Sequence, residues 1–110
     1  MICEAASVVV VPFPFTDLPL SKPRPAAVLS GRAFNAADDH TVLAMVTTAA
    51  ASRWASDHPL ADWAAAGLRT PCVVRMKLFT LENRLIAREV GRLAAADWRA
   101  VRARVTRALG

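Results

Sequence analysis

Residues 8–30 read VVVVPFPFTDLPLSKPRPAAVLS, two strand-like runs on either side of a polar, proline-interrupted loop. Valine and phenylalanine favour strands, so residues 8–15 and 26–30 are predicted to be β-strands. Pro12 and Pro14 cannot donate a hydrogen bond to a neighbouring strand. The first strand is therefore expected either to lie at a sheet edge or to leave alternate N–H positions unpaired.

Arg24 stands between Pro23 and Pro25 at the end of this loop. Pro25 disfavours the helical region for Arg24, and Pro23 fixes the backbone just before it. The guanidinium is therefore predicted to project from a stiff, extended backbone at the entrance of the second strand. A cation in that position can hold an anion, or it can be a surface charge between edge-blocking prolines, and this stretch alone favours neither interpretation.

The chain has 110 residues, of which 55% are apolar, and no composition shift marks a linker. We expect one domain over residues 1–110 with a sizeable core. No apolar run approaches the length of about 18 residues that spans a bilayer, and no export signal is evident at the N-terminus, so a cytoplasmic protein is expected. Cys3 and Cys72 are too few for a metal site or a disulfide framework and are expected to be reduced.

The net charge of +5 is concentrated towards the C-terminus. Residues 1–70 contain five Lys/Arg and six Asp/Glu, whereas residues 71–110 contain nine and three. This imbalance favours a polyanionic partner, either a nucleic acid or an acidic protein segment. A solvated basic helix face would account for the same imbalance without any ligand.

The remaining chain shows further short strands and one helix. Strands are predicted over residues 41–48, 72–79 and 85–93, with a polar turn at 35–40 and a long loop at 49–67 that includes a short strand near 57–63. In residues 72–79, Arg75 and Lys77 should share one face, and the other face should be apolar. From residue 94, apolar residues recur at helical spacing, which predicts a terminal amphipathic helix of about four turns. This order predicts a mainly-β fold, a strongly bent antiparallel sheet or open barrel capped by the helix.

Candidate catalytic motifs are few. No Gly-rich phosphate loop, no pair of histidines at metal-ligand spacing and no G-x-S-x-G occurs in the sequence. His40 and His58 are isolated, and either could serve as a general base. A histidine in a surface turn is the simpler interpretation of both.

Three motifs in order carry a family resemblance: PFPFTD in the first strand, Lys-x-Arg-Pro before the second, and the block AGL, VVR, K and TL within residues 66–81. Together they resemble the MazF/PemK-like ribonuclease toxins of bacterial type II toxin–antitoxin modules, over nearly the whole chain. The resemblance implies a CcdB/MazF-type, SH3-like small barrel with a C-terminal helix, usually a homodimer. It also implies a growth-inhibiting endoribonuclease that cuts single-stranded RNA (mRNA) by 2′-hydroxyl attack, without a cofactor or metal, and that a cognate antitoxin blocks.

The resemblance also assigns residue roles. Arg24 falls on the arginine that stabilises charge at the scissile phosphate, Thr47 on the hydroxyl residue that closes the third strand, and Arg75 on a cation used for phosphate contact or proton transfer. These three are the expected catalytic residues. The expected RNA-binding residues are Phe15, Thr16, Lys22, Thr48 and Lys77.

Two departures from the family pattern bear on catalysis. Most relatives begin the first strand with Gly-Asp or Gly-Glu, where this chain has Ala6-Ser7. Some relatives place an acidic general base at the position of Lys77, and a lysine cannot accept a proton unless its pKa is strongly depressed. The general base is therefore unassigned. A non-catalytic toxin on the same fold, like the gyrase-poisoning CcdB toxins, a degenerate toxin, and a plain SH3-like binding module remain as alternatives.

Overall fold

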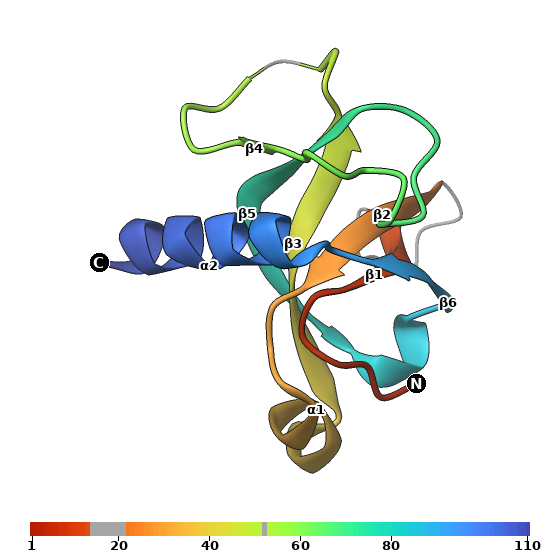
Figure 1. Cartoon of the computed structure of the whole chain (residues 1–110). Coiled ribbons are helices and arrows are strands. Elements are labelled where there is room, and N and C mark those ends of the chain that lie inside the picture. The colour runs from red at the N-terminus through yellow and green to blue at the C-terminus, as the bar shows by residue number, and fades with distance from the viewer. Residues whose placement is uncertain (14–21, 52) are drawn as a thin grey trace.

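The computed structural model describes residues 1–13, 22–51 and 53–110 (Figure 1). Phe15 and Thr16 of the expected RNA-binding set, and the strand predicted beyond Phe13, therefore lie outside the described residues. The elements are, in order, β1 (Ser7–Phe13), β2 (Lys22–Val28), α1 (Arg32–Asp38), β3 (His40–Thr48), β4 (His58–Pro59), β5 (Cys72–Glu82), the 3₁₀ turn η1 (Asn83–Leu85), β6 (Arg88–Arg92) and α2 (Ala95–Leu109).

Within these ranges, six strands form one antiparallel sheet in the order β4-β5-β3-β2-β1-β6. The sheet curls until β6 meets the segment that follows β4, where the Arg92 N–H donates to the Ala65 carbonyl at 3.3 Å. Gly91 permits this approach, because a Cβ there would lie only 2.4 Å from the carbonyl carbon of Ala66. The predicted bent sheet with a C-terminal helix is confirmed.

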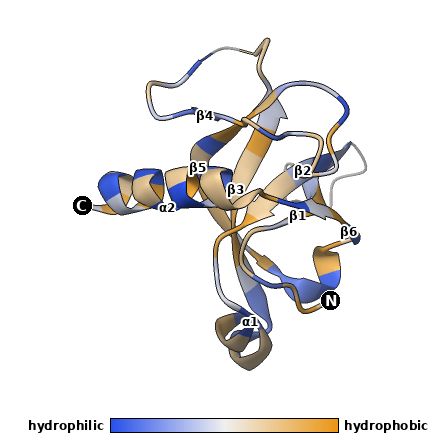
Figure 2. Cartoon of the chain, viewed as in Figure 1, coloured by the Kyte–Doolittle hydropathy of each residue, from blue (hydrophilic) through white to orange (hydrophobic). Residues whose placement is uncertain are grey.

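Each face of the sheet has its own apolar core. The face under α2 buries Val8, Ala27, Ala44, Val46 and Val74 together with Val101 of the helix. The opposite face buries Val9, Val11, Ala26, Val28 and Leu43. Helix α2 lies across the first face (Figure 1) and carries hydrophobic and hydrophilic residues side by side (Figure 2), which confirms the predicted amphipathic helix. No helix in the described part of the chain is long and apolar enough to cross a membrane.

The prolines of the opening stretch set where the ladder ends. Strand β1 is not an edge strand, because it pairs with both β2 and β6. Instead, Pro12 faces Pro23 and Val10 faces Pro25, at alternate positions where neither partner donates to the other. The missing N–H of Pro25 is thus on the side of β3, and the β2–β3 ladder ends at the pair Ala26 and Met45. Residues 22–25 consequently pair with β1 but not with β3.

The structure corrects the prediction for residues 35–40 and the predicted start of the second strand. Residues 35–40 are not a turn, because helix α1 occupies Arg32–Asp38 and ends at Asp39, which has a left-handed φ of 54°. Asn35 is fully buried, and its amide donates to the Cys3 carbonyl at 2.9 Å, so a residue typical of turns anchors a helix instead. The second strand begins at Lys22 rather than at residue 26.

Other expectations fare better. Strand β3 falls on the predicted run, and β4 is the short strand expected within the long loop. Strand β5 continues to Glu82, beyond its predicted end at residue 79, and β6 covers only Arg88–Arg92 of the predicted 85–93, because η1 includes Leu85. Cys3 and Cys72 are free and buried, as expected for reduced thiols.

Ala6, at the position where most relatives have glycine, adopts φ 74°. That left-handed conformation costs an alanine about 1 kcal/mol relative to glycine.

Candidate functional site

The predicted catalytic residues share one face of the sheet, opposite to α2. Alternation along the strands places Arg24, Thr47 and Arg75 on the same side as Ala26 and Met45. Ala26 faces Met45 in the last pair of the β2–β3 ladder, and Arg24 and Thr47 each lie two residues beyond that pair. The β2–β3 ladder therefore ends at the prolines that flank Arg24, and Arg24 and Thr47 lie beyond that point on the same face.

A basic cluster of Lys22, Arg24 and Lys77 borders this point. Lys22 pairs with Phe13 in the β1–β2 ladder, and the Lys77 ammonium lies 5.1 Å from the centre of the Phe13 ring. All three cations are exposed, and Arg24 has no carboxylate partner among the residues that the structure describes. These side chains can therefore approach an anionic ligand without first breaking an ion pair.

Arg75 is held differently from the basic cluster. It is only 7% exposed, and its Nε and Nη2 donate to the two carboxylate oxygens of Asp57 at 3.0 and 2.9 Å. Its guanidinium carbon also lies 5.2 Å from the centre of the Trp54 ring. The hydrogen bonds from Arg75 hold the pKa of Asp57 below its usual range. Arg75 therefore anchors the segment 53–57 to β5 in this structure.

Thr48 does not join the site face. It follows Thr47 directly, so its side chain belongs to the opposite side of β3, in register with Cys72 of the core under α2. The structure thus gathers Lys22, Arg24, Thr47 and Lys77 on one face, places Arg75 on that face in an ion pair, and separates Thr48 from them.

Sequence reasoning did not identify Asp57 and Trp54 as parts of this site. Both lie in a loop without helical or strand periodicity, and Asp57 is 18 residues from Arg75 along the chain. Their partnership arises because β4 pairs with β5 and brings the loop alongside Arg75. In the sequence, the only sign of this role was the presence of Trp54 and Asp57 in a long predicted loop.

His58 forms a buried link on the other face of the sheet. It pairs with Val74, and its Nε2 lies 2.8 Å from Oδ1 of Asp97 in α2. Asp97 also accepts the N–H groups of Ala61 and Asp62 at 2.9 and 3.0 Å. The surface-turn interpretation of His58 is therefore wrong. This link fixes α2 to the loop, and it lies on the face opposite to Arg24.

Acid should weaken this link. Burial raises the pKa of Asp97, but hydrogen bonds from Ala61, His58 and Asp62 outweigh that effect and leave the pKa below its usual range. A carboxyl group with a lowered folded-state pKa stabilises the fold above its unfolded pKa of about 3.9, and this stabilisation is lost as pH falls through the folded-state pKa. We expect Asp97→Asn to lower the free energy of unfolding at pH 7 by about 2 kcal/mol and to flatten its decline below about pH 4.

Urea unfolding at pH 7 and at steps below pH 4 measures both effects. Asp38→Asn, which removes an exposed carboxylate from α1, controls for the change in net charge. An Asp97→Asn variant with the acid sensitivity of the wild type would show that this carboxylate does not contribute to the pH dependence.

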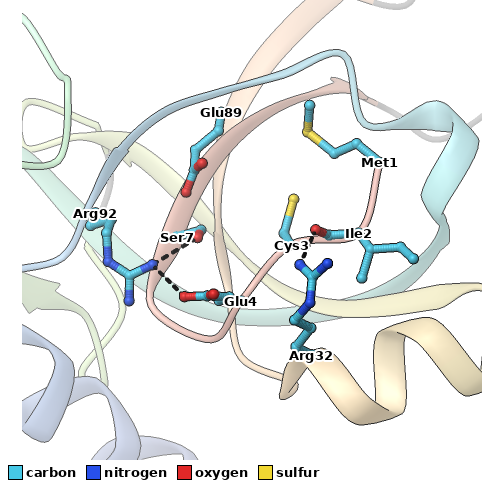
Figure 3. Close-up of a pocket in the computed structure, with 8 residues that line it drawn as sticks. All are labelled: Met1, Ile2, Cys3, Glu4, Ser7, Arg32, Glu89 and Arg92. Atoms are coloured by element: carbon cyan, nitrogen blue, oxygen red, sulfur yellow. Dashed lines mark hydrogen bonds and ion pairs between the residues drawn. The ribbon is translucent and has the colours of Figure 1, made fainter.

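A cavity of about 330 Å³ lies elsewhere, around the N-terminal segment (Figure 3). Its two arginines already have internal partners: Arg92 contacts Glu4 at 3.3 Å and Ser7 at 3.4 Å, and Arg32 donates to the Ile2 carbonyl at 3.0 Å (Figure 3). None of the residues expected from the sequence to form a site lines it. We therefore place the candidate site at the basic cluster and Thr47.

The curled antiparallel sheet, the C-terminal helix and the cation-bearing face define a small barrel-type protein with a basic surface on the face opposite to α2. The family model described as PemK-like, MazF-like toxin of type II toxin–antitoxin systems matches residues 4–109. The chain belongs to this family and is a toxin of a toxin–antitoxin module, which confirms the resemblance seen in its motifs. No curated protein sequence matches it.

Solved structures share the fold. A chain of the MazE-MazF crystal structure (Form-III) from Deinococcus radiodurans has a TM-score of 0.81 at 22% identity and covers 100% of this chain and 98% of its own. The Mycobacterium tuberculosis toxin MazF-mt6 has a TM-score of 0.75 at 21% identity, covering 94% and 95%. An endoribonuclease in complex with its cognate antitoxin, from a Mycobacterial species, has a TM-score of 0.74 at 17% identity, covering 99% and 94%.

Proposed function

We propose that this toxin is a metal-independent endoribonuclease that cuts single-stranded RNA. The observation that carries the proposal is the position of Arg24, exposed on an extended, proline-flanked strand and on the same sheet face as Thr47, Lys22 and Lys77. In the proposed reaction a ribose 2′-oxygen bonds to the adjacent phosphorus and gives up its proton to solvent water. The bond from phosphorus to the 5′-oxygen breaks, and this oxygen takes up a proton from solvent. The products are a 2′,3′-cyclic phosphate and a 5′-hydroxyl end.

Arg24 would stabilise the charge that develops during this attack. Negative charge builds on the non-bridging phosphate oxygens, and a guanidinium offers two parallel N–H donors to them. By analogy with oxyanion-hole donors, such a group contributes about 10²- to 10³-fold in rate. Thr47 can add a neutral hydroxyl donor, and Lys22 and Lys77 can hold flanking phosphates of the same strand.

The proposal assigns no general base. Asp57 is the carboxylate that the structure places beside Arg75, but its lowered pKa makes it a poor proton acceptor at neutral pH. Lys77, at the position where some relatives have an acid, is an exposed cation over the Phe13 ring. Catalysis therefore rests on charge stabilisation by Arg24 and hydrogen bonding by Thr47.

We further propose that the protein acts as a cytoplasmic homodimer and that a cognate antitoxin blocks the same face. Two similar structures are described as complexes, one of MazE with MazF and one of an endoribonuclease with its cognate antitoxin. An acidic antitoxin segment would complement the basic cluster, so antitoxin and RNA would compete. That competition gives the module a direct means of inhibition.

The test is cleavage of a mixed-sequence single-stranded RNA by the purified toxin, with EDTA present. We expect discrete RNA fragments, no cutting of single-stranded DNA of the same sequence, and suppression of cutting by a stoichiometric amount of the antitoxin. Absence of RNA cleavage by folded protein would contradict the proposal and favour the gyrase-poison or degenerate-toxin alternatives. Unchanged cleavage in a stable toxin–antitoxin complex would contradict the competition.

A further inference from the structure

A second cavity, of about 280 Å³, continues the candidate site towards the β4 edge of the sheet. The residues that line it are Ala49, Arg53, Trp54, Ala55, Asp57, Pro59 and Val73. Thr47 pairs with Val73, and Val73 pairs with Pro59, so these three side chains follow one another across the same face. Neighbouring strands are about 4.8 Å apart, which puts the cavity within about 10 Å of Thr47.

Trp54 forms a fixed aromatic wall of this cavity. Its side chain is 44% exposed, but its backbone is closed into a tight turn, because its N–H donates to the Asp57 carboxylate at 2.9 Å and its carbonyl accepts the Asp57 N–H at 3.1 Å. The Arg75 guanidinium then supports the indole from within the protein at 5.2 Å. An aromatic ring that is exposed and yet held in place is a prepared stacking surface, since little conformational entropy is lost when a ligand binds.

The charges around the indole favour an anionic, aromatic ligand. Asp57 is paired with Arg75, whereas Arg53 at the cavity wall is an exposed cation. Bases of single-stranded nucleic acids stack on aromatic side chains while nearby cations hold the phosphates, and every base has a face that can stack. An acidic peptide could pair its carboxylates with Arg53, but it would offer no flat aromatic group to stack on the Trp54 indole.

We propose that this cavity binds one nucleobase of the RNA, next to the nucleotide held at Arg24 and Thr47, with the base stacked on Trp54. This inference rests on the proposed ribonuclease function and deepens it, because it locates a subsite that would determine which RNA sequences are held. Arg75 gains a second role as a positioning residue, since it orients both Trp54 and Asp57.

The inference is tested by measuring how tightly the wild type and Trp54 variants bind an RNA and a set of RNAs that each lack one base. The probe is a 2′-O-methyl version of an RNA that the wild type cuts, or of the mixed-sequence RNA if it cuts none, together with a series in which one base at a time is removed. Binding is measured by fluorescence anisotropy for the wild type, Trp54→Ala and Trp54→Phe. Phe34→Ala is the matched control, because Phe34 is also 44% exposed but lies on α1.

We expect Trp54→Ala to weaken binding of the complete RNA about 10-fold, within the range for loss of one base stack. Trp54→Phe should recover most of the affinity, and Phe34→Ala should leave it unchanged. Removal of the base at one position should weaken wild-type binding by a similar factor and should have almost no effect on Trp54→Ala. Melting temperatures close to that of the wild type would exclude unfolding as the cause.

Other outcomes would overturn the inference. If the wild type cuts RNA and Trp54→Ala binds it equally well, the cavity is not a base site, although the ribonuclease function stands. If Trp54→Ala loses affinity equally for every base-deleted RNA, Trp54 acts through the loop and not by stacking. If only antitoxin binding is weakened, the cavity serves the protein partner. If the wild type neither binds nor cuts RNA, both the function and the base site are wrong.

Discussion

Arg24→Ala is expected to slow RNA cleavage about 10²- to 10³-fold and to abolish growth inhibition, because it removes the donor proposed to face the scissile phosphate. The fold should survive, since Arg24 is exposed and has no carboxylate partner among the described residues. We expect a melting temperature within about 5 °C of the wild type. The measurements are initial cleavage rates at equal folded concentration and thermal melts of the same samples.

Arg99→Ala is the matched control for charge. Arg99 is an exposed arginine of α2, which covers the opposite face of the sheet, and its loss should change cleavage less than threefold by our estimate for a distant surface charge. Thr47→Ala should cost less than Arg24→Ala, because only one neutral donor is lost. If Arg24→Ala cuts RNA as fast as the wild type, Arg24 is a surface charge and the proposed site is wrong.

Arg75→Ala is expected to impair both stability and cleavage. The guanidinium is buried between Asp57 and Trp54, so Arg75 contributes to the packing of the loop as well as to the charge of the site. Removing it leaves the Asp57 carboxylate, itself only 7% exposed, without its cation. Breaking one side of a buried pair is strongly destabilising, so we expect a melting temperature lowered by about 10 °C or more. Differential scanning calorimetry measures the effect.

The double variant Arg75→Ala/Asp57→Ala separates pairing from packing. Removing both charges leaves no unpaired carboxylate, so the double variant should melt higher than the sum of the two single effects predicts. Additive effects would mean that the ion pair contributes little and that Arg75 stabilises the loop mainly through its contact with Trp54. Cleavage should fall in Arg75→Ala even where the protein is fully folded, because the segment 53–57 loses its anchor.

Much of the fold could be predicted from the local sequence. Runs of strand-forming residues and one stretch with apolar residues at helical spacing account for most of its elements. Helix α1 could not be predicted in this way, since its seven residues include Asn35, whose partners Cys3 and Asn83 are distant in the chain. Its helical state depends on tertiary hydrogen bonds that no local pattern encodes. Pro12 and Pro14 left open whether the first strand lies at a sheet edge, and only the topology shows that β1 pairs on both sides, with β2 and with β6.

The site could be predicted only in part, because it also depends on contacts between residues that are distant in the chain. Strand alternation placed Arg75 and Lys77 on one face, as predicted, whereas their environments differ because a loop from outside the strand supplies Asp57 and Trp54 to one of them. Thr48 was expected to bind RNA, but it follows Thr47 directly, and adjacent residues of a strand point to opposite faces. The family motifs identified the positions of candidate site residues, whereas the strand topology determines which of their side chains contact one another.

The most direct test of the central claim is the chemistry of the cleavage product. An RNA that the purified toxin cuts is compared with the same RNA carrying a single 2′-deoxy ribose on the 5′ side of the scissile phosphate, and the ends of the product are identified by mass spectrometry. We predict a 2′,3′-cyclic phosphate and a 5′-hydroxyl from the unmodified RNA, and no cutting at the 2′-deoxy position. Equal cutting of the 2′-deoxy substrate, or a 5′-phosphate end, would contradict attack by the 2′-hydroxyl and with it the role proposed for Arg24.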